Sequence, residues 1–186
     1  MKKWQVLACL AALSVTVAGC GDDKSASTQQ QESKQTTTQN QPKQEEAGKD
    51  AFVKYLDSIR PILQENVELG AKFQEARTQS SNRQLSNADF AKLLSDTLIP
   101  EGNKMQEELA AIHPEAEFHD VHEKLNKMVG SSVQAFTELV AAVDTGDTSK
   151  VTSANQLMAE ARELDQQLLG DLQSLAKKYG VELNKQ

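Results

Sequence analysis

The stretch FHDVHEKLNKMVGSSVQAFTELVAAV, residues 118–143, decides the fold of this chain. Its large apolar side chains recur every three or four residues, so an α-helix places them along one face. The positions on that face are Phe118, Val121, Leu125, Met128, Ser132, Phe136, Leu139 and Val143. One such stripe is buried only when it packs against other elements, and the segment therefore predicts a helix within a helical assembly.

Three other segments show the same helical period. Their stripe positions are Phe52, Leu56, Ile59, Leu63, Gly70 and Phe73, then Phe90, Leu93, Leu94, Leu98, Met105, Leu109 and Ile112, and finally Val151, Ala154, Met158, Ala161, Leu164, Leu168, Leu172 and Leu175. No window shows the sustained period-2 alternation of β-branched residues that predicts a strand. The loop before the last helix is short, which makes the last two helices antiparallel. We therefore predict an all-α fold, an antiparallel four-helix bundle.

Turn and capping residues mark where these helices begin and end. The motif SNAD at residues 86–89 has the form of a capping box and predicts a helix start. Residues 113–114, His-Pro, predict a helix end, because the residue before proline is pushed out of the α region. Gly146 and Gly180 suit the position just after a helix C-terminus.

Two prolines interrupt the stripes. Pro61 lies inside the first segment, and Pro100 follows Ile99 where we expect a break in the second segment. A proline inside a helical pattern either kinks the helix or opens a new one at its first position. A bundle of five or six helices is therefore the alternative to four.

The N-terminal residues have the pattern of a secretory signal peptide. Two lysines follow Met1, an uncharged and largely apolar run spans residues 4–18, and small residues precede Cys20. The run of about 15 residues is shorter than the ~20 that a helix needs to cross a membrane. We predict that residues 1–19 are a signal peptide that is removed.

The motif VAGC at residues 17–20 resembles the lipobox of bacterial lipoproteins. The resemblance implies that Cys20 receives a diacylglycerol and becomes the first residue of the mature protein. Two acyl chains hold a protein stably at a membrane, so the resemblance also implies a lipid anchor on the extracytoplasmic face of the cell membrane. The alternative is an ordinary signal peptide, or an uncleaved anchor, in which Cys20 is incidental.

Residues 20–48 join Cys20 to the first apolar stripe. From Lys24 to Gly48 they are rich in Gln, Ser and Thr and contain no large apolar side chain. Such a segment buries too little surface to offset the entropy lost on ordering. We predict a disordered tether over residues 20–48 and a bundle domain over residues 49–186.

The charge of the mature chain bounds its partners. Removing residues 1–19 takes two of the 20 basic residues, Lys2 and Lys3, and leaves 18 against 27 acidic ones, a formal charge of −9. This balance argues against nucleic acid and against anionic lipid headgroups as electrostatic partners. Cys9 leaves with the signal peptide and Cys20 is acylated, so disulfide and thiolate chemistry are excluded.

All three histidines lie between residues 113 and 122. On a helix, His119 and His122 are one turn apart on one face, and Glu115 precedes His119 by one turn. Two imidazoles and a carboxylate are ligands for a divalent transition metal, and histidine also titrates near neutral pH, which would suit a pH sensor. The spacing matches neither H-E-x-x-H nor the paired E-x-x-H of di-iron bundles, and the simpler alternative is a solvated first helical turn.

Catalytic residues are not arranged in a recognisable motif. We expect the acidic residues of the last helix to form a solvated face, because acid–base catalysis needs a dry pocket; they are Glu160, Glu163, Asp165 and Asp171. The serines lack a nucleophile-elbow context, and no phosphate-binding loop or dinucleotide fingerprint is present. We predict no enzymatic activity and no cofactor, and we expect Gly70 and Gly130 to permit close helix packing.

The tether, the His-Pro-Glu sequence at residues 113–115 and the closing KKYGV at residues 177–181 resemble small, all-helical extracytoplasmic lipoproteins of Gram-positive type, a group of uncharacterised function. The resemblance supplies no catalytic residues. We therefore expect a membrane-anchored, non-enzymatic interaction or cell-envelope module, held by the diacylglycerol on Cys20 and able to bind an envelope protein. The alternative is a metal- or small-ligand-binding lipoprotein that uses the His119 and His122 face.

Overall fold

The computed structural model describes residues 41–183, with side chains from residue 46 onward. The predicted signal peptide, Cys20 and the tether as far as residue 40 lie outside the described residues. The described part has no strand. Its elements are α1 (Gln41–Ser81), α2 (Asn87–Leu93), the π-helical segment η1 (Leu94–Leu98), α3 (Ile99–Ala111), the 3₁₀ turn η2 (Ala116–Phe118), α4 (His119–Thr145) and α5 (Thr148–Tyr179).

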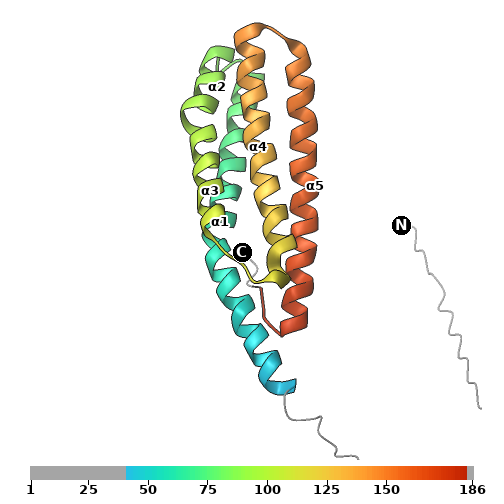
Figure 1. Cartoon of the computed structure of the whole chain (residues 1–186). Coiled ribbons are helices and arrows are strands. Elements are labelled where there is room, and N and C mark those ends of the chain that lie inside the picture. The colour runs from blue at the N-terminus through green and yellow to red at the C-terminus, as the bar shows by residue number, and fades with distance from the viewer. Residues whose placement is uncertain (1–40, 184–186) are drawn as a thin grey trace, which may run out of the picture. The chain divides into compact units, whose positions relative to one another are not determined.

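These elements form four antiparallel helical arms around one core (Figure 1). The arms are α1, the run from α2 through η1 to α3, α4, and α5. Helix α1 lies beside α3 and α5, and α4 lies beside the same two helices, so α1 and α4 face each other across the core. The prediction of an all-α four-helix bundle is confirmed.

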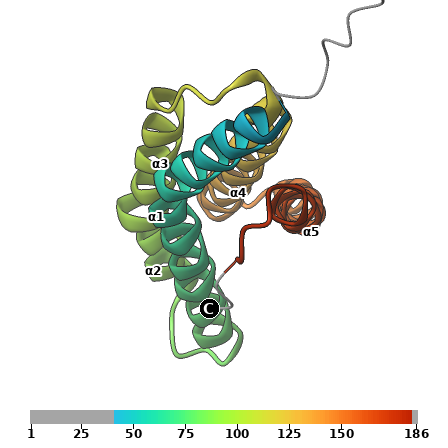
Figure 2. The ribbon, with the colours of Figure 1, turned by 90° about the horizontal axis from the view of Figure 1, so that it is seen from below.

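Neither proline divides an arm of the bundle. Pro61 lies inside the continuous helix α1, whose axis changes direction between its cyan and green parts in both views (Figures 1 and 2). A proline removes one backbone hydrogen bond and crowds the preceding turn, which accounts for a bend. The expected break at Ile99–Pro100 is wrong, because Pro100 opens α3 directly after the π-helical segment and the helical path continues.

The folded part begins earlier than the predicted boundary at residue 49. Helix α1 starts at Gln41, so residues 41–48 are helical and do not belong to a disordered tether. These residues are mostly Gln, Lys, Glu and Ala, which are strong helix formers although they provide no apolar stripe. Gly48 also packs on the end of α5, since a Cβ atom added there would lie 2.7 Å from Cε1 of Tyr179.

The predicted helix ends are confirmed where the structure describes them. The Ser86 hydroxyl oxygen accepts the Asp89 backbone N–H at 3.1 Å, as an N-cap does. Gly146 and Gly180 both adopt left-handed backbone conformations, with φ of 72° and 60°. After Gly180, the backbone N–H of Val181 donates to the carbonyl of Ala176 at 2.9 Å, which closes a Schellman-type end.

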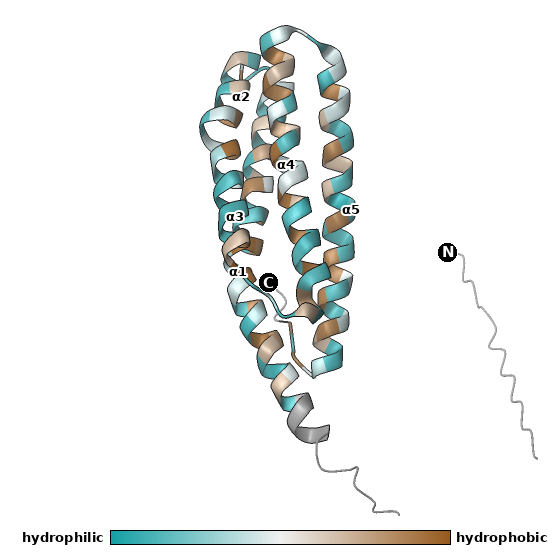
Figure 3. Ribbon diagram, in the orientation of Figure 1, coloured by the Kyte–Doolittle hydropathy of each residue, from teal (hydrophilic) through white to brown (hydrophobic). Residues whose placement is uncertain are grey.

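The apolar stripes form the core, as predicted, with two exceptions. Figure 3 shows apolar positions recurring along each helix between runs of polar ones. Most stripe positions are buried or half-buried, including Phe52, Phe118 and Phe136, which are almost fully buried. Gly70 on α1 and Val151 on α5 are instead exposed. Both exceptions lie along the side where α1 faces α5.

Aromatic side chains cluster at the end of the bundle where α1 begins and α5 ends. The rings of Phe118 and Tyr55 stack with centroids 5.1 Å apart, and Phe52 lies 5.7 Å from Phe118. Tyr179 at the end of α5 completes this group, 5.6 Å from Phe52. We call these four residues the aromatic end; through them α1, α5 and the turn η2 that precedes α4 contact one another.

Candidate functional site

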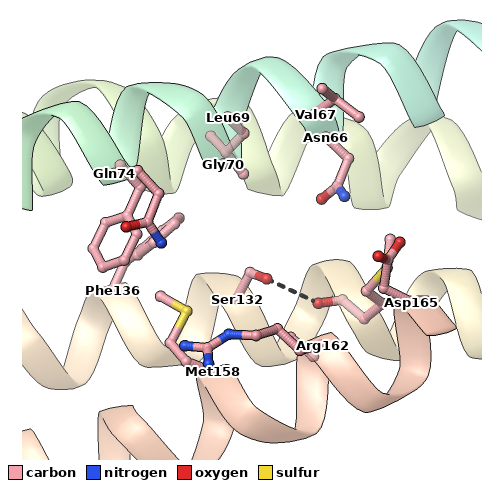
Figure 4. Close-up of a pocket in the computed structure, with 13 residues that line it drawn as sticks. Asn66, Val67, Leu69, Gly70, Gln74, Ser132, Phe136, Met158, Arg162 and Asp165 are labelled. Atoms are coloured by element: carbon pink, nitrogen blue, oxygen red, sulfur yellow. Dashed lines mark hydrogen bonds between the residues drawn. The ribbon is translucent and has the colours of Figure 1, made fainter. Parts of the chain in front are cut away.

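A groove separates α1 from α5 and reaches down to α4. Its first part encloses about 260 Å³ (Figure 4). The floor and walls are mainly apolar and come from all three helices; they include Leu69 and Phe73 of α1, Met128 and Phe136 of α4, and Met158 and Ala161 of α5. Asn66 and Gln74 of α1 and Arg162 and Asp165 of α5 add polar groups at its edges.

Small residues leave the groove open. Gly70 faces it without a side chain, and a Cβ atom placed there would meet nothing within 4 Å. The neighbouring Val67 also lines the groove and is 71% exposed. Helices α1 and α5 therefore touch at the aromatic end, through Gly48, Phe52 and Tyr179, and separate further along their length.

A second cavity of about 200 Å³ continues the groove. It shares Phe73, Met158 and Arg162 with the first, so the two adjoin. Its other lining residues come from the end of α1, from α2, from α4 and from the start of α5; they are Arg77, Ser80, Ser81, Phe90, Leu139, Val151, Ala154 and Asn155. We call the two cavities together the α1–α5 groove. Each cavity by itself is smaller than the range of about 300–1,000 Å³ typical of small-molecule sites, and the two adjoin.

The charges along the groove are unevenly placed. The second cavity is lined by two arginines, Arg77 and Arg162, and by no carboxylate, whereas Asp165 lines only the first cavity. Within the part of the chain that the structure describes, neither arginine forms an ion pair. In Figure 4 the Arg162 side chain runs along the groove toward Met158 and away from Asp165. One end of the groove is therefore cationic in a protein whose net charge is negative.

Two of the three serine hydroxyls that line the groove already donate hydrogen bonds to backbone carbonyls. Ser132 donates its hydroxyl to the carbonyl of Met128 at 3.1 Å, and Ser81 donates to the carbonyl of Arg77 at 2.8 Å. The backbone of Ser80 accepts the N–H of Arg83 at 3.0 Å, which fixes the turn after α1. Arginine is the strongest anion-binding group among these polar side chains, because its guanidinium is always charged and has several donors.

The predicted metal ligands do not assemble. Residues 112–115 are not helical and Glu115 has extended backbone angles, so Glu115 does not lie one helical turn before His119. The His119 Nε2 atom lies 3.0 Å from the Pro114 carbonyl oxygen, and the His122 Nε2 atom lies 3.1 Å from that of Leu109. Across residues 41–183, no three His, Cys, Asp or Glu side chains are grouped to hold a metal ion. The structure therefore does not bring Glu115, His119 and His122 together as one set of ligands, and metal binding at the His119 and His122 face stays a prediction.

His122 packs against the aromatic end instead. Its ring lies edge-on to Tyr55 with centroids 6.1 Å apart, and burial lowers its pKa below the ordinary value. Burial also raises the pKa of Tyr55. Among the described residues, the Tyr55 hydroxyl and the His122 Nδ1 atom are the buried side-chain polar atoms without a hydrogen-bond partner. This arrangement makes His122 a neutral packing residue with a pH-dependent cost of burial.

The acidic residues of α5 do not converge on a pocket. Asp171 forms an ion pair with Lys124 of α4, and Glu163 accepts a hydrogen bond from Gln167 at 3.3 Å. Glu160 is exposed, and only Asp165 of this set lines the groove. Of this set, only Asp171 contributes to the α4–α5 contact, and no two of the four line the groove together.

The sequence alone did not single out the groove. Gly70 was expected to permit close packing, and it faces open space instead. Arg77 and Arg162 look like ordinary surface charges on a polar helix face, and no local pattern marks them. The one available signal was weak: Gly70 and Val151, two small positions within long stripes, provide little side chain to close the space between their helices.

No protein family, curated protein or solved structure matches this chain. Among residues 41–183, none of the helices combines the length and the apolar character that crossing a membrane requires.

Proposed function

We propose that this chain is a lipid-anchored, non-enzymatic binding module on the extracytoplasmic face of the cell membrane, and that the α1–α5 groove is its binding surface. The anchor rests on the signal-peptide pattern of residues 1–19 and on the lipobox-like VAGC at residues 17–20. The segment between Cys20 and the start of α1 at Gln41 would connect the bundle to the membrane.

The binding role is supported mainly by two positions of the apolar stripes that no other helix covers. Gly70 and Val151 belong to the apolar stripes, yet both are exposed and both line the groove. Apolar surface left in water forgoes about 25 cal/mol for each Å² that burial would remove. A ligand with an apolar part gains that free energy when it covers the exposed Val67 and Val151 and the half-buried Met158, which line the groove. Concave, mostly apolar sites with a few polar groups are the usual form of a ligand pocket.

The groove is testable by site-specific photocrosslinking in cells. A photoreactive amino acid at Val67 lies on the groove, whereas the same amino acid at Leu169, which is 55% exposed on α5, lies outside it. We expect an envelope component to be captured from position 67 and not from position 169. Equal capture from both positions, or none from position 67, would contradict a binding role for the groove.

A groove-filling substitution supplies the matched control. Gly70→Leu places a side chain in the open space of the groove, and Gly170→Leu places the same side chain in open space on α5 outside it. We expect Gly70→Leu to abolish the capture from position 67 and Gly170→Leu to preserve it. Capture that survives Gly70→Leu would show that the occupant binds elsewhere.

The anchor is tested separately. Cys20→Ser removes the thiol that a diacylglycerol would modify, so we expect the protein to leave the membrane fraction or to accumulate as uncleaved precursor. Membrane fractionation and the mass of the product measure this. A normally processed, membrane-retained Cys20→Ser protein would overturn the proposed anchor without bearing on the groove.

A further inference from the structure

We infer that the α1–α5 groove binds a single-chain anionic amphiphile, with the anionic head at Arg77 and Arg162 and the apolar chain along the first cavity. This inference rests on the groove being the binding surface, as proposed above, and it adds the chemistry and the orientation of the ligand. The two adjoining cavities provide the two environments that such a molecule requires, one cationic and one apolar.

The head position follows from the distribution of charge. Arg77 comes from the last turns of α1 and Arg162 from the middle of α5, and both line the second cavity, which has no carboxylate in its lining. Both lack an ion pair within residues 41–183, so neither has to be released from a described carboxylate before it binds an anion. Guanidinium groups match the planar, multidentate geometry of phosphate and carboxylate groups.

The chain position follows from the apolar lining and from Asp165. Phe73 and Met158 line both cavities, and Leu69, Met128, Phe136 and Ala161 extend the apolar surface through the first cavity. Asp165 lines this first cavity alone, so it repels an anionic head there and favours the orientation with the head at Arg77. Arg162 lies where the cavities adjoin, which places a positive charge at the boundary between head and chain.

The net charge of the chain is compatible with this ligand. The chain carries a formal charge of −7, which opposes docking on an extended anionic membrane surface. A single small anion inside the groove interacts mainly with charges within the Debye length of about 8–10 Å, and the second cavity has only positive charges in its lining. Residues 24–40 contain no large apolar side chain, so this N-terminal segment offers nothing that could cover the apolar floor.

The decisive experiment compares three probes on the unlipidated full chain carrying Cys20→Ser. Decyl phosphate has the head and the chain, decanol has the chain alone, and inorganic phosphate has the head alone. Titration calorimetry below the micelle concentration should show decyl phosphate binding at least tenfold more tightly than either of the other two. Equal binding of decanol would overturn the anionic assignment, and equal binding of inorganic phosphate would overturn the need for a chain.

Substitutions locate the head. We expect Arg77→Gln and Arg162→Gln each to weaken the binding of decyl phosphate by about tenfold, because a hydrogen bond to a charged group contributes about 1.5 kcal/mol or more. Arg162→Lys should keep part of the affinity, since it retains the charge and loses the fork of donors. Arg60→Gln removes the same charge from α1 outside the groove and should leave the affinity unchanged. Unchanged affinity in both groove variants would overturn the assignment of the head.

Failure of this inference is distinguishable from failure of the proposed function. If position 67 captures an envelope protein or a second copy of this chain in cells, the groove is a binding surface and the amphiphile is the wrong occupant. If no probe binds and position 67 captures nothing, both proposals fail. If decyl phosphate binds but Gly70→Leu does not weaken its binding, the amphiphile site lies outside the groove and the inference is wrong.

Discussion

Two mid-helix glycines show how differently the helices of this bundle pack. Gly102 is buried where α3 crosses α4, and a Cβ atom there would overlap the Cγ2 atom of Val133. Gly70 lies where α1 faces α5, and a Cβ atom there would meet nothing within 4 Å. The same residue type thus permits a close helix contact on one side of the bundle and leaves a groove on the other. Close packing stabilises the α3–α4 side, and open space makes the α1–α5 side available to a ligand.

The largest expected difference is in the stability lost when a side chain is truncated at the aromatic end and when one is truncated in the groove. Phe118 is 1% exposed and contacts Phe52, Tyr55 and Tyr179, so Phe118→Ala should lower the free energy of unfolding by about 3–5 kcal/mol. Met158→Ala, in the half-open groove, should lower it by less than about 2 kcal/mol, because its surroundings already contain empty volume. Urea unfolding followed by circular dichroism measures both. Similar losses at the two sites would mean that the groove is as well packed as the aromatic end.

The α3–α4 contact should not tolerate an added methyl group. We expect Gly102→Ala to lower the free energy of unfolding by about 1–3 kcal/mol, because the methyl overlaps Val133 and the two helices must move apart. Val133→Ala made in the same chain should recover part of the loss by removing the overlapping atoms. A double variant whose loss equals the sum of the two single losses would show that the two residues do not interact.

A methyl group added at Gly70 on the α1–α5 side should instead stabilise the protein. Gly70→Ala adds a methyl group in open space and raises helix propensity, so we expect it to raise the free energy of unfolding by about 0.5–1 kcal/mol. Gly170→Ala, also facing open space on α5, should have the same effect. A destabilising Gly70→Ala alongside a stabilising Gly170→Ala would indicate that α1 and α5 are closer together in solution than in this structure.

The smallest expected effect is a pH dependence of the aromatic end. Burial lowers the pKa of His122 below its ordinary value of about 6.5, so the unfolded chain takes up the proton at higher pH than the folded one. The stabilisation is therefore present above about pH 6.5 and decreases as the pH falls toward the pKa of the folded state. The free energy of unfolding, measured between pH 7 and pH 5 for the parent, His122→Gln and His119→Gln, tests this. The slope should diminish most in His122→Gln and only slightly in His119→Gln, because His119 contributes least to the lowered pKa of His122. An unchanged slope in His122→Gln would assign the pH dependence to other groups.

The metal hypothesis shows where a spacing argument goes wrong. It placed Glu115 and His119 on one helical face, which requires residues 115–119 to be helical throughout. His113-Pro114 follows the end of α3, as predicted, but the non-helical path continues beyond it, and Glu115 has extended backbone angles before the 3₁₀ turn at Ala116–Phe118. A spacing of four residues brings side chains together only inside a regular helix.

The start of the folded part shows a second reason why a prediction from sequence alone can be wrong. Residues 41–48 lack an apolar stripe, so a criterion based on apolar burial assigned them to the tether. Their helix depends on intrinsic propensity, on continuity with the buried segment that follows, and on the contact of Gly48 with Tyr179. Gly48 and Tyr179 lie near opposite ends of the sequence of the bundle. A prediction from neighbouring residues therefore cannot include their contact.

The sequence by itself determined the helices, their antiparallel order and most of the core. The apolar period, the capping motif at residues 86–89 and the C-terminal Gly146 and Gly180 act within four or five residues, so they can be interpreted from neighbouring positions alone. Only the tertiary structure decided that α3 and α4 touch at Gly102 and Val133, and that Gly70, Arg77 and Arg162 share an open groove. The distance between two helices depends on side chains far apart in the sequence, and it is that distance which turns a stripe position into either core or binding surface.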